Sequence, residues 1–331
     1  MTKQRDKKKK LTSLILLLFL TIIMLSTATY AWFTANKTVT VSTLDVHVDA
    51  KDGLLISTDG FNWKTIITNA DITGAKAGRY GNAINQVPTT LEPVSTAGDV
   101  GASGYINMFT GAIGKADDGS GGFTVVTTLA TEANGSTGNY IAFDLFLRSE
   151  AGGQIYLTPD SNVLKKGVDD KGLKNAARVA FLIMGNTASD SPLATIQGLN
   201  GTTANTSVLW EPNVDVHTIN GVNAASSVYG ITTTTGPGAA AIPYAGAYTA
   251  IPAISPVKLE LAVDGTYFKD VTPTITTIEG ETTYKNAFII GTGITKIRVY
   301  MWIEGQDVDC ENNASGSDIS FNVQFSATDQ P

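Results

Sequence analysis

The residues best suited to bind an ion lie close together near the end of the chain. Acidic side chains alternate there as Asp307, Asp309 and Glu311, and Asp318 follows a few positions later. Ca²⁺ takes about six to eight oxygen ligands, and alternating acidic residues are typical of calcium loops. The EF-hand pattern is not met, because the sixth position holds no Gly and the twelfth no Glu. Two hypotheses stay open: a Ca²⁺ site at these four residues, or an acidic loop without an ion.

Groups that could act as a catalytic nucleophile or base are few. The chain has two histidines, His47 and His217, and one cysteine, Cys310. A serine or cysteine nucleophile needs a base and an orienting partner, and no such motif surrounds these residues. The H-E-x-x-H, P-loop and strand-linked G-x-G-x-x-G patterns are also absent from the sequence. We therefore expect a protein that is not an enzyme and that requires no cofactor.

The composition favours strands over helices. Among 331 residues, 16% are charged, below the roughly 25% usual for soluble domains. Glycine is abundant at 33 residues, and Thr is also frequent, whereas the Glu, Lys and Leu that fill solvated helix faces are scarce. A single cysteine excludes an intrachain disulfide framework. These features predict a Thr- and Gly-rich β protein.

The first residues have the pattern of an export signal. Lys and Arg dominate residues 1–10, and the uncharged apolar run Leu11–Leu25 follows them. This run is shorter than the roughly 20 residues of a transmembrane helix. Small residues at Thr29 and Ala31 predict cleavage after Ala31 by a signal peptidase, which makes Trp32 the first mature residue; cleavage after Ala28 is the fallback, and a retained membrane anchor is the alternative. In each case the body of the protein lies at the cell surface or in the extracellular space.

The charge distribution argues against a nucleic-acid partner. The net charge is −7, although residues 1–31 carry a clear positive excess. The remaining chain is therefore more acidic than the whole, and it lacks the basic surface that nucleic-acid binding requires. We expect contact with a membrane only through the N-terminal segment before cleavage.

Several segments alternate apolar and polar residues as half-buried strands do. The clearest are Tyr140–Arg148, Lys296–Glu304 and Asp318–Phe325. Thr38–Val48 also alternates, but its phase changes near Ser42-Thr43, which predicts a bulge that switches faces. Lys171–Met184 is the one credible helical region, either as a helix or as a short helix that runs into a strand from Val179.

These elements predict an all-β fold, a jelly-roll-like two-sheet β-sandwich with long loop insertions and one short helix. Residues 1–31 form the signal peptide and residues 32–331 form a single domain. Residues 186–255 are poorly patterned and low in charge, so we expect a loop-rich insertion there.

The junction Ala28-Thr29-Tyr30-Ala31-Trp32-Phe33-Thr34 and the following Thr43-Leu44-Asp45-Val46 segment resemble the camelysin/TasA-like exported proteins of Gram-positive bacteria. The resemblance is carried mainly by residues 26–48. It implies a dedicated signal peptidase and a jelly-roll subunit that polymerises into biofilm-matrix fibres, each subunit giving its N-terminal strand to a neighbour. It also raises the expectation of Ca²⁺ at the acidic loop. Camelysin has been classed as a metallopeptidase, but this sequence contains no zinc-ligand set, so that activity is not carried over.

The mature N-terminus supplies a candidate assembly strand, residues 32–48, which could be donated to a neighbour. Trp32 and Phe33 would expose two large apolar side chains, and Val39 and Val41 begin the alternating segment that follows. Residues 32–41 can extend about 33 Å at 3.3 Å per residue, far enough to reach a second copy of the chain. The same residues could instead fold back onto their own sandwich.

Three functions remain open from the sequence. The first is a structural subunit of an extracellular fibre, a homopolymer formed by strand donation. The second is a monomeric or membrane-anchored surface adhesin, or glycan-binding module, that uses aromatics such as Trp63 and Trp210. The third and weakest is an exported hydrolase.

Overall fold

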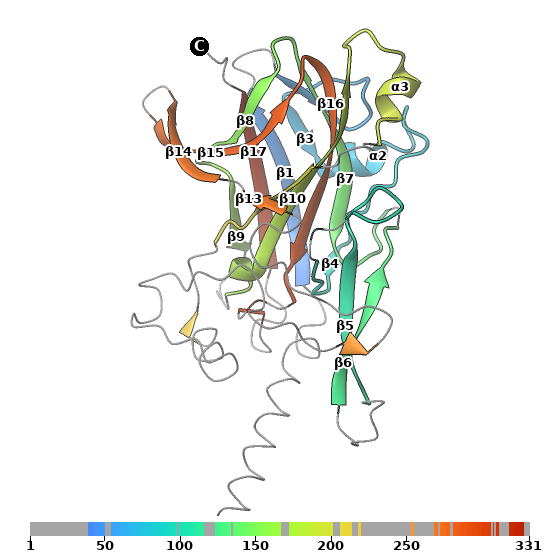
Figure 1. Cartoon of the computed structure of the whole chain (residues 1–331), viewed down its shortest axis with the longest axis vertical. Coiled ribbons are helices and arrows are strands. Elements are labelled where there is room, and N and C mark those ends of the chain that lie inside the picture. Colours follow the sequence, from blue (N-terminus) through green and yellow to red (C-terminus); the bar gives the residue numbers. More distant parts are fainter. Residues whose placement is uncertain are drawn as a thin grey trace, which may run out of the picture.

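The computed structural model describes residues 39–49, 54–96, 98, 100–115, 123–133, 135–166, 172–200, 206–213, 218–219, 253–254, 268–270, 272–278, 281–305, 307, 309–310 and 318–327; of the strand residues 39–49, 111–115, 123–127, 206, 253–254, 268–270, 272–278, 281–285 and 318 only the backbone is described. Most of these residues lie in strands, and the strands form two large sheets that pack face to face (Figure 1). The predicted all-β sandwich is confirmed.

The first sheet has eight strands and contains both the first and the last described strand. Its order is β14(Thr272–Ile278)–β15(Glu281–Ile290)–β8(Gly153–Leu157)–β17(Asp318–Ala327)–β1(Val39–Asp49)–β3(Ile66–Thr68), with β4(Thr90–Leu91) beside β1 and β9(Asn162–Lys166) beside β17. The pairings are antiparallel except that of β1 with β17, which is parallel.

The second sheet has six strands, in the order β13(Phe268–Asp270)–β11(Thr206–Trp210)–β10(Ala177–Thr187)–β16(Gly293–Ile303)–β7(Ile141–Ser149)–β2(Leu55–Ser57). A smaller three-stranded sheet, β12(Ala253–Ile254)–β6(Phe123–Ala130)–β5(Met108–Lys115), extends from one end of the sandwich (Figure 1). The helical elements are short: α2(Asn69–Gly74), α3(Leu193–Gln197) and the 3₁₀ turn η1(Leu173–Ala176).

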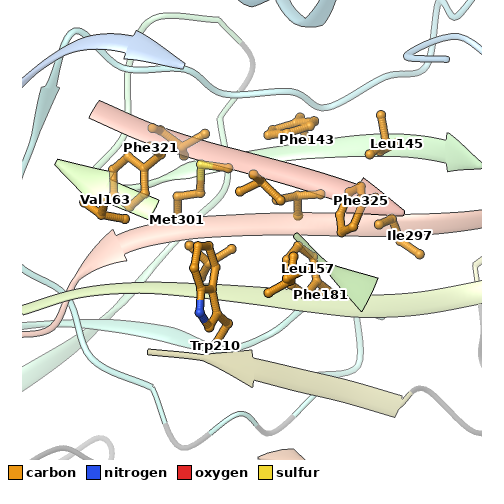
Figure 2. Packing of buried hydrophobic residues seen from close by; sticks show 14 of the residues in the cluster. Phe143, Leu145, Leu157, Val163, Phe181, Trp210, Ile297, Met301, Phe321 and Phe325 are labelled. Atoms are coloured by element: carbon orange, nitrogen blue, oxygen red, sulfur yellow. The ribbon is translucent and has the colours of Figure 1, made fainter. Parts of the chain in front are cut away.

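The main core fills the space between the two large sheets. Inward side chains of the six-stranded sheet, such as Phe181 and Met301, meet those of the eight-stranded sheet, such as Phe321 and Phe325 (Figure 2). The Phe181 and Phe325 rings pack edge to face across the two sheets, with centroids 5.3 Å apart. Each such buried side chain contributes about 1.5–3 kcal/mol, so this core holds the sandwich together.

The strand predictions are confirmed where the alternation was strong. The residues expected to face inward on the strands at 141–147, 297–303 and 319–325 are all buried in the main core. The helix expected over Lys171–Met184 is limited to η1, and β10 begins at Ala177. The reason is that the apolar run Val179–Met184 forms part of a central strand that is covered on both faces. Ala176 and Ala177, which favour a helix, are buried where this strand begins. The described part of 186–255 includes the end of β10, α3 and β11.

The outer face of the six-stranded sheet is also covered. Val94, Ile106 and Met108 pack against its outward side chains at one end, and Tyr80 and Ile196 pack against them at the other. This layer was not expected, because most of its residues come from the Gly- and Asn-rich segment 69–122, whose composition indicates loops with short strands, and Ile196 comes from α3. As a result, every residue of β16 is buried.

Candidate functional site

The strand that carries the predicted assembly residues lies inside the eight-stranded sheet. β1 pairs in parallel with β17 on one side, in a register that places Leu44 beside Phe321 and Val48 beside Phe325. On its other side it pairs antiparallel with two short strands, first β4 and then β3. β1 therefore lies between β17 and two short strands that come from other parts of the chain.

The predicted change of phase in this strand is confirmed. The register between β1 and β17 shifts between Val41 and Thr43, so one extra residue stands at Ser42. Before the shift, Val39 and Thr40 pair with Leu91 and Thr90 of β4. After it, Asp45–His47 pair with β3. The bulge thus marks the point at which β1 changes its neighbour.

The edge of β17 that receives β1 has the alternation expected of one core face and one outer face. Ile319, Phe321, Val323 and Phe325 are buried in the core. The residues between them, such as Asn322 and Gln324, are only partly buried, and Gln324 accepts a hydrogen bond from the Thr158 hydroxyl at 2.5 Å. A strand in this position must follow the same alternation to match the sheet.

Several predicted site residues lie outside the described part of the chain: Thr29, Ala31, Trp32, Phe33 and Glu311. Val39 and Val41 lie within β1, in register with Leu91 and Ile319 respectively. Among the described residues, no helix is long and apolar enough to cross a bilayer. The predicted signal segment 1–31 is not among them.

Two of the predicted calcium ligands are buried and have protein partners. Asp307 Oδ2 accepts a hydrogen bond from Arg178 Nη2 at 2.6 Å, within an ion pair, and its Oδ1 accepts one from the backbone N–H of Asp309 at 2.8 Å. Asp309 Oδ1 accepts from the backbone N–H of Thr218 at 2.9 Å. Asp318 begins β17 opposite Lys166. Within the described ranges, no three His, Cys, Asp or Glu residues are grouped so as to hold a metal; Ca²⁺ binding stays a prediction.

Arg178 was not identified from the sequence, although it is the residue around which the acidic loop is arranged. It is fully buried at the start of β10 and forms a second ion pair with Glu211. Burial by itself would lower the pKa of Arg178, but the carboxylates of Glu211 and Asp307 raise it above its ordinary value. The guanidinium therefore stays charged and fastens the chain after β16 and the chain after β11 to the same strand.

A second buried charge cluster lies on the covered outer face of the six-stranded sheet. Arg298 Nη1 donates to Asp144 Oδ1 at 2.7 Å, Lys296 Nζ lies 3.1 Å from Asp144 Oδ2, and the Tyr80 hydroxyl donates to the same oxygen at 2.7 Å. Arg298 also pairs with Glu132. The pairing of β7 with β16 places Asp144 opposite Arg298, which the alternation within each strand could not show.

The cluster shifts the pKa values of its two acids in opposite directions. Burial would raise the pKa of Asp144, but the charges of Arg298 and Lys296 hold it below its ordinary value. Burial raises the pKa of Glu132, and Arg298 only partly opposes this. The cluster holds two acids and two bases. It joins Tyr80 and Glu132, which lie outside the sheet, to side chains of β7 and β16.

The structure also contains a surface cleft of about 410 Å³ beside α2. Its polar lining includes Asn62, Lys64 and Asp71, and the Lys64 ammonium donates to Asp71 Oδ1 at 2.5 Å. Phe61 is 47% exposed nearby, with the Arg79 guanidinium 3.8 Å from the centre of its ring. The lining of this cleft therefore combines charged, polar and apolar side chains.

No protein-family model, curated protein or solved structure matches this chain.

The two aromatics expected to serve a surface-binding function have different positions. Trp210 is 3% exposed and packs in the main core, so it offers no surface platform; that expectation was wrong, because β11 turns this side chain inward, toward the eight-stranded sheet. Trp63 is half-buried, with the Arg148 guanidinium 6.0 Å from its ring centre. Cys310 is buried, and His47 occupies a position in β1 opposite Gln324 and Ile66.

Proposed function

We propose that this protein is an exported structural subunit of an extracellular fibre or matrix, and that its subunits join by exchange of the N-terminal strand. The observation that carries the proposal is the place of β1 between β17 on one side and β3 and β4 on the other. As the first described strand, β1 completes a sheet in which its longest partner, β17, comes from the far end of the described chain. A second copy of β1 offers the same backbone hydrogen bonds and the same alternation, as strand addition requires.

The predicted signal explains how assembly is timed. Before cleavage, the residues that precede β1 are joined to a membrane-inserted segment, so they cannot reach a second subunit. Cleavage after Ala31 releases them with Trp32 and Phe33 at the new end. Burial of each aromatic in a neighbour would contribute about 2 kcal/mol. We extend the proposal to a jelly-roll connectivity for the sandwich, in line with the family resemblance.

Blocking cleavage tests this timing. Ala31→Leu places a large residue at the position where the peptidase needs a small one, and Ala28→Leu is the matched control at the fallback site. We expect fibres in negative-stain images of the control and of the wild type, whose secreted chain begins at Trp32. The Ala31→Leu chain should remain in the membrane fraction without fibres. Fibres at the normal rate from uncleaved protein would contradict the proposal.

Deleting residues 32–41 tests the strand itself. The mature protein without these residues should fold, stay soluble and form no fibres, because it retains the acceptor edge and lacks the donor. A truncated chain that assembles at the normal rate would exclude strand exchange.

A second function is supported by the cleft near α2. Its polar lining beside exposed Phe61 suits a saccharide, which would make the chain a surface adhesin or glycan-binding module. Screening of the purified protein on a glycan array separates the two functions. Binding that is lost in Asn62→Ala, in protein that forms no fibres, would favour the adhesin.

Calcium binding at Asp307, Asp309, Glu311 and Asp318 remains part of the proposal. Calorimetric titration with Ca²⁺ should show heat, and the melting temperature should rise, since an ion that binds only the folded state stabilises it. Asp318→Asn removes one ligand outside the Arg178 ion pair and should weaken both effects. Absence of heat and of any shift in melting temperature would dispose of the site.

A further inference from the structure

The two parts of β1 are held to their own subunit by unequal numbers of backbone pairings. After the bulge, every residue from Thr43 to Asp49 is in register with a residue of β17, and Asp45–His47 also pair with β3. Before the bulge, only Val41 pairs with β17, and Val39-Thr40 pair with a strand of two residues, β4. The first part is therefore much easier to separate from its own sandwich.

The far end of β1 is tied to the opposite sheet. Five residues separate Asp49 from Leu55, where β2 begins in the six-stranded sheet. The six Cα–Cα steps from Asp49 to Leu55 reach at most about 22 Å, and crossing between packed sheets takes about 10 Å of this. Movement of all of β1 into a neighbour would therefore pull on this short connection and on β2, although Ile56 is fully buried and pairs with Leu147 of β7.

The edge that would receive a donated strand does not depend on the donor. Immediately after β4, the Glu92 N–H donates to the Asn139 carbonyl at 3.1 Å, and the Val94 N–H donates to the Ile303 carbonyl at 3.0 Å. Leu91 and Ile319 are both fully buried core residues, which an empty position beside them would expose. The acceptor therefore stays in place and gains apolar burial when a strand arrives.

We infer that β1 divides at the bulge: the segment ending at Val41 is exchanged between copies of the chain, while Thr43–Asp49 stays in its own sheet. Ser42 is the hinge, and the acceptor is the edge formed by Thr90-Leu91 and Ile319 of the second copy. The inference rests on the proposed fibre function and adds to it which residues move. A bulge suits this role because it already interrupts the ladder, so a change of direction there breaks no further pairing.

Two matched cysteine pairs test the division, both in a Cys310→Ala background. Thr40→Cys with Thr90→Cys reports on the part before the bulge, and His47→Cys with Ile66→Cys on the part after it. Each pair joins directly opposed residues of antiparallel strands, and Thr90 and Ile66 are exposed. After mild oxidation of the soluble monomer, both pairs should form cross-links within one chain, which checks the geometry.

In fibres, the two pairs should differ. The 40–90 pair should convert most of the protein into a covalent ladder on non-reducing gels, whereas the 47–66 pair should give only internally linked monomer. A ladder from both pairs would show that the whole strand is exchanged, which overturns the inference and leaves the proposed function standing. Fibres with no ladder from either pair would overturn strand exchange altogether, and the absence of fibres would overturn the proposed function.

A mixing experiment covers the case in which a double variant folds poorly. Fibres grown from equal amounts of a Thr40→Cys chain and a Thr90→Cys chain can form the 40–90 bond only between subunits. We expect cross-linked dimers from this mixture and none from the corresponding His47→Cys and Ile66→Cys mixture. Dimers in the second mixture at the level of the first would overturn the inference.

Discussion

The central strands of the two sheets differ in what covers them. All residues of β16 are buried, because the six-stranded sheet packs against the core on one face and against the segments around Tyr80 and Val94 on the other. In β17, buried residues alternate with partly exposed ones, because the outer face of the eight-stranded sheet borders solvent. We call the covered outer face of the six-stranded sheet the closed face and the outer face of the eight-stranded sheet the open face.

The loss of stability caused by a substitution should be largest where it leaves a buried charge without its partner. Arg298→Ala leaves Asp144 and Glu132 on the closed face without their guanidinium, and we expect the free energy of unfolding to fall by about 3–5 kcal/mol. Arg148→Ala in the neighbouring strand is the control, since that side chain is 36% exposed, its ion-pair partner Glu150 is exposed, and its guanidinium lies as far as 6.0 Å from the Trp63 ring centre. It should change the value by less than about 0.5 kcal/mol in urea titrations. Equal effects would mean that the outer layer does not seal the sheet.

At inward positions the two sheets should behave alike. Met301→Ala in β16 and Ile319→Ala in β17 each remove a fully buried side chain from the shared core. Both should lower the free energy of unfolding by about 2–5 kcal/mol. Ile289→Ala, at a position 72% exposed on β15, should have almost no effect. If only the Met301 variant is destabilised, the eight-stranded sheet is not packed on the core as described.

Acid should act on the closed face through Asp144. Its pKa in the folded state lies below the ordinary value of 3.8, so below about pH 4 the unfolded chain takes up this proton first. Stability should then fall by up to about 1.4 kcal/mol per pH unit from this group. Glu132 acts in the opposite direction. Its folded pKa is raised above 4.5, so the folded state takes up this proton first and gains stability as the pH falls through that range.

Urea unfolding midpoints at a series of pH values measure this balance. Asp144→Asn should reduce the loss of stability that occurs below pH 4. Glu132→Gln should remove the gain in stability that protonation of Glu132 gives at higher pH. Unchanged slopes in both variants would mean that neither carboxyl titrates within the cluster.

The smallest effect is expected on the open face. Gln324→Ala removes one hydrogen bond with Thr158 from a partly exposed position, and the groups left behind can reach water. The free energy of unfolding should fall by about 0.5–1.5 kcal/mol. A loss as large as that of Arg298→Ala would show that the outer face of the eight-stranded sheet is also covered.

The same contrast explains how much could be predicted from the sequence. Alternation in Asp318–Phe325 predicted β17 correctly because one of its faces borders solvent. The bulge at Ser42 was visible for the same reason, as a change of phase. Alternation alone does not reveal the layer over Asp144 and Arg298, because its residues come from other segments, such as Tyr80, 64 positions from Asp144. The Arg178 ion pair was missed for the same reason.

The parallel pairing of β1 with β17 has a consequence for how the protein folds. Val41 and Ile319 are neighbours in the sheet although almost the whole chain lies between them. Such a contact carries a high loop-closure cost, and topologies dominated by distant contacts fold slowly. The chain emerges from its N-terminus onward, so β1 is made first and must wait for β17, its longest partner, until nearly all residues have been synthesised. Throughout that interval the first strand has no finished sheet to join.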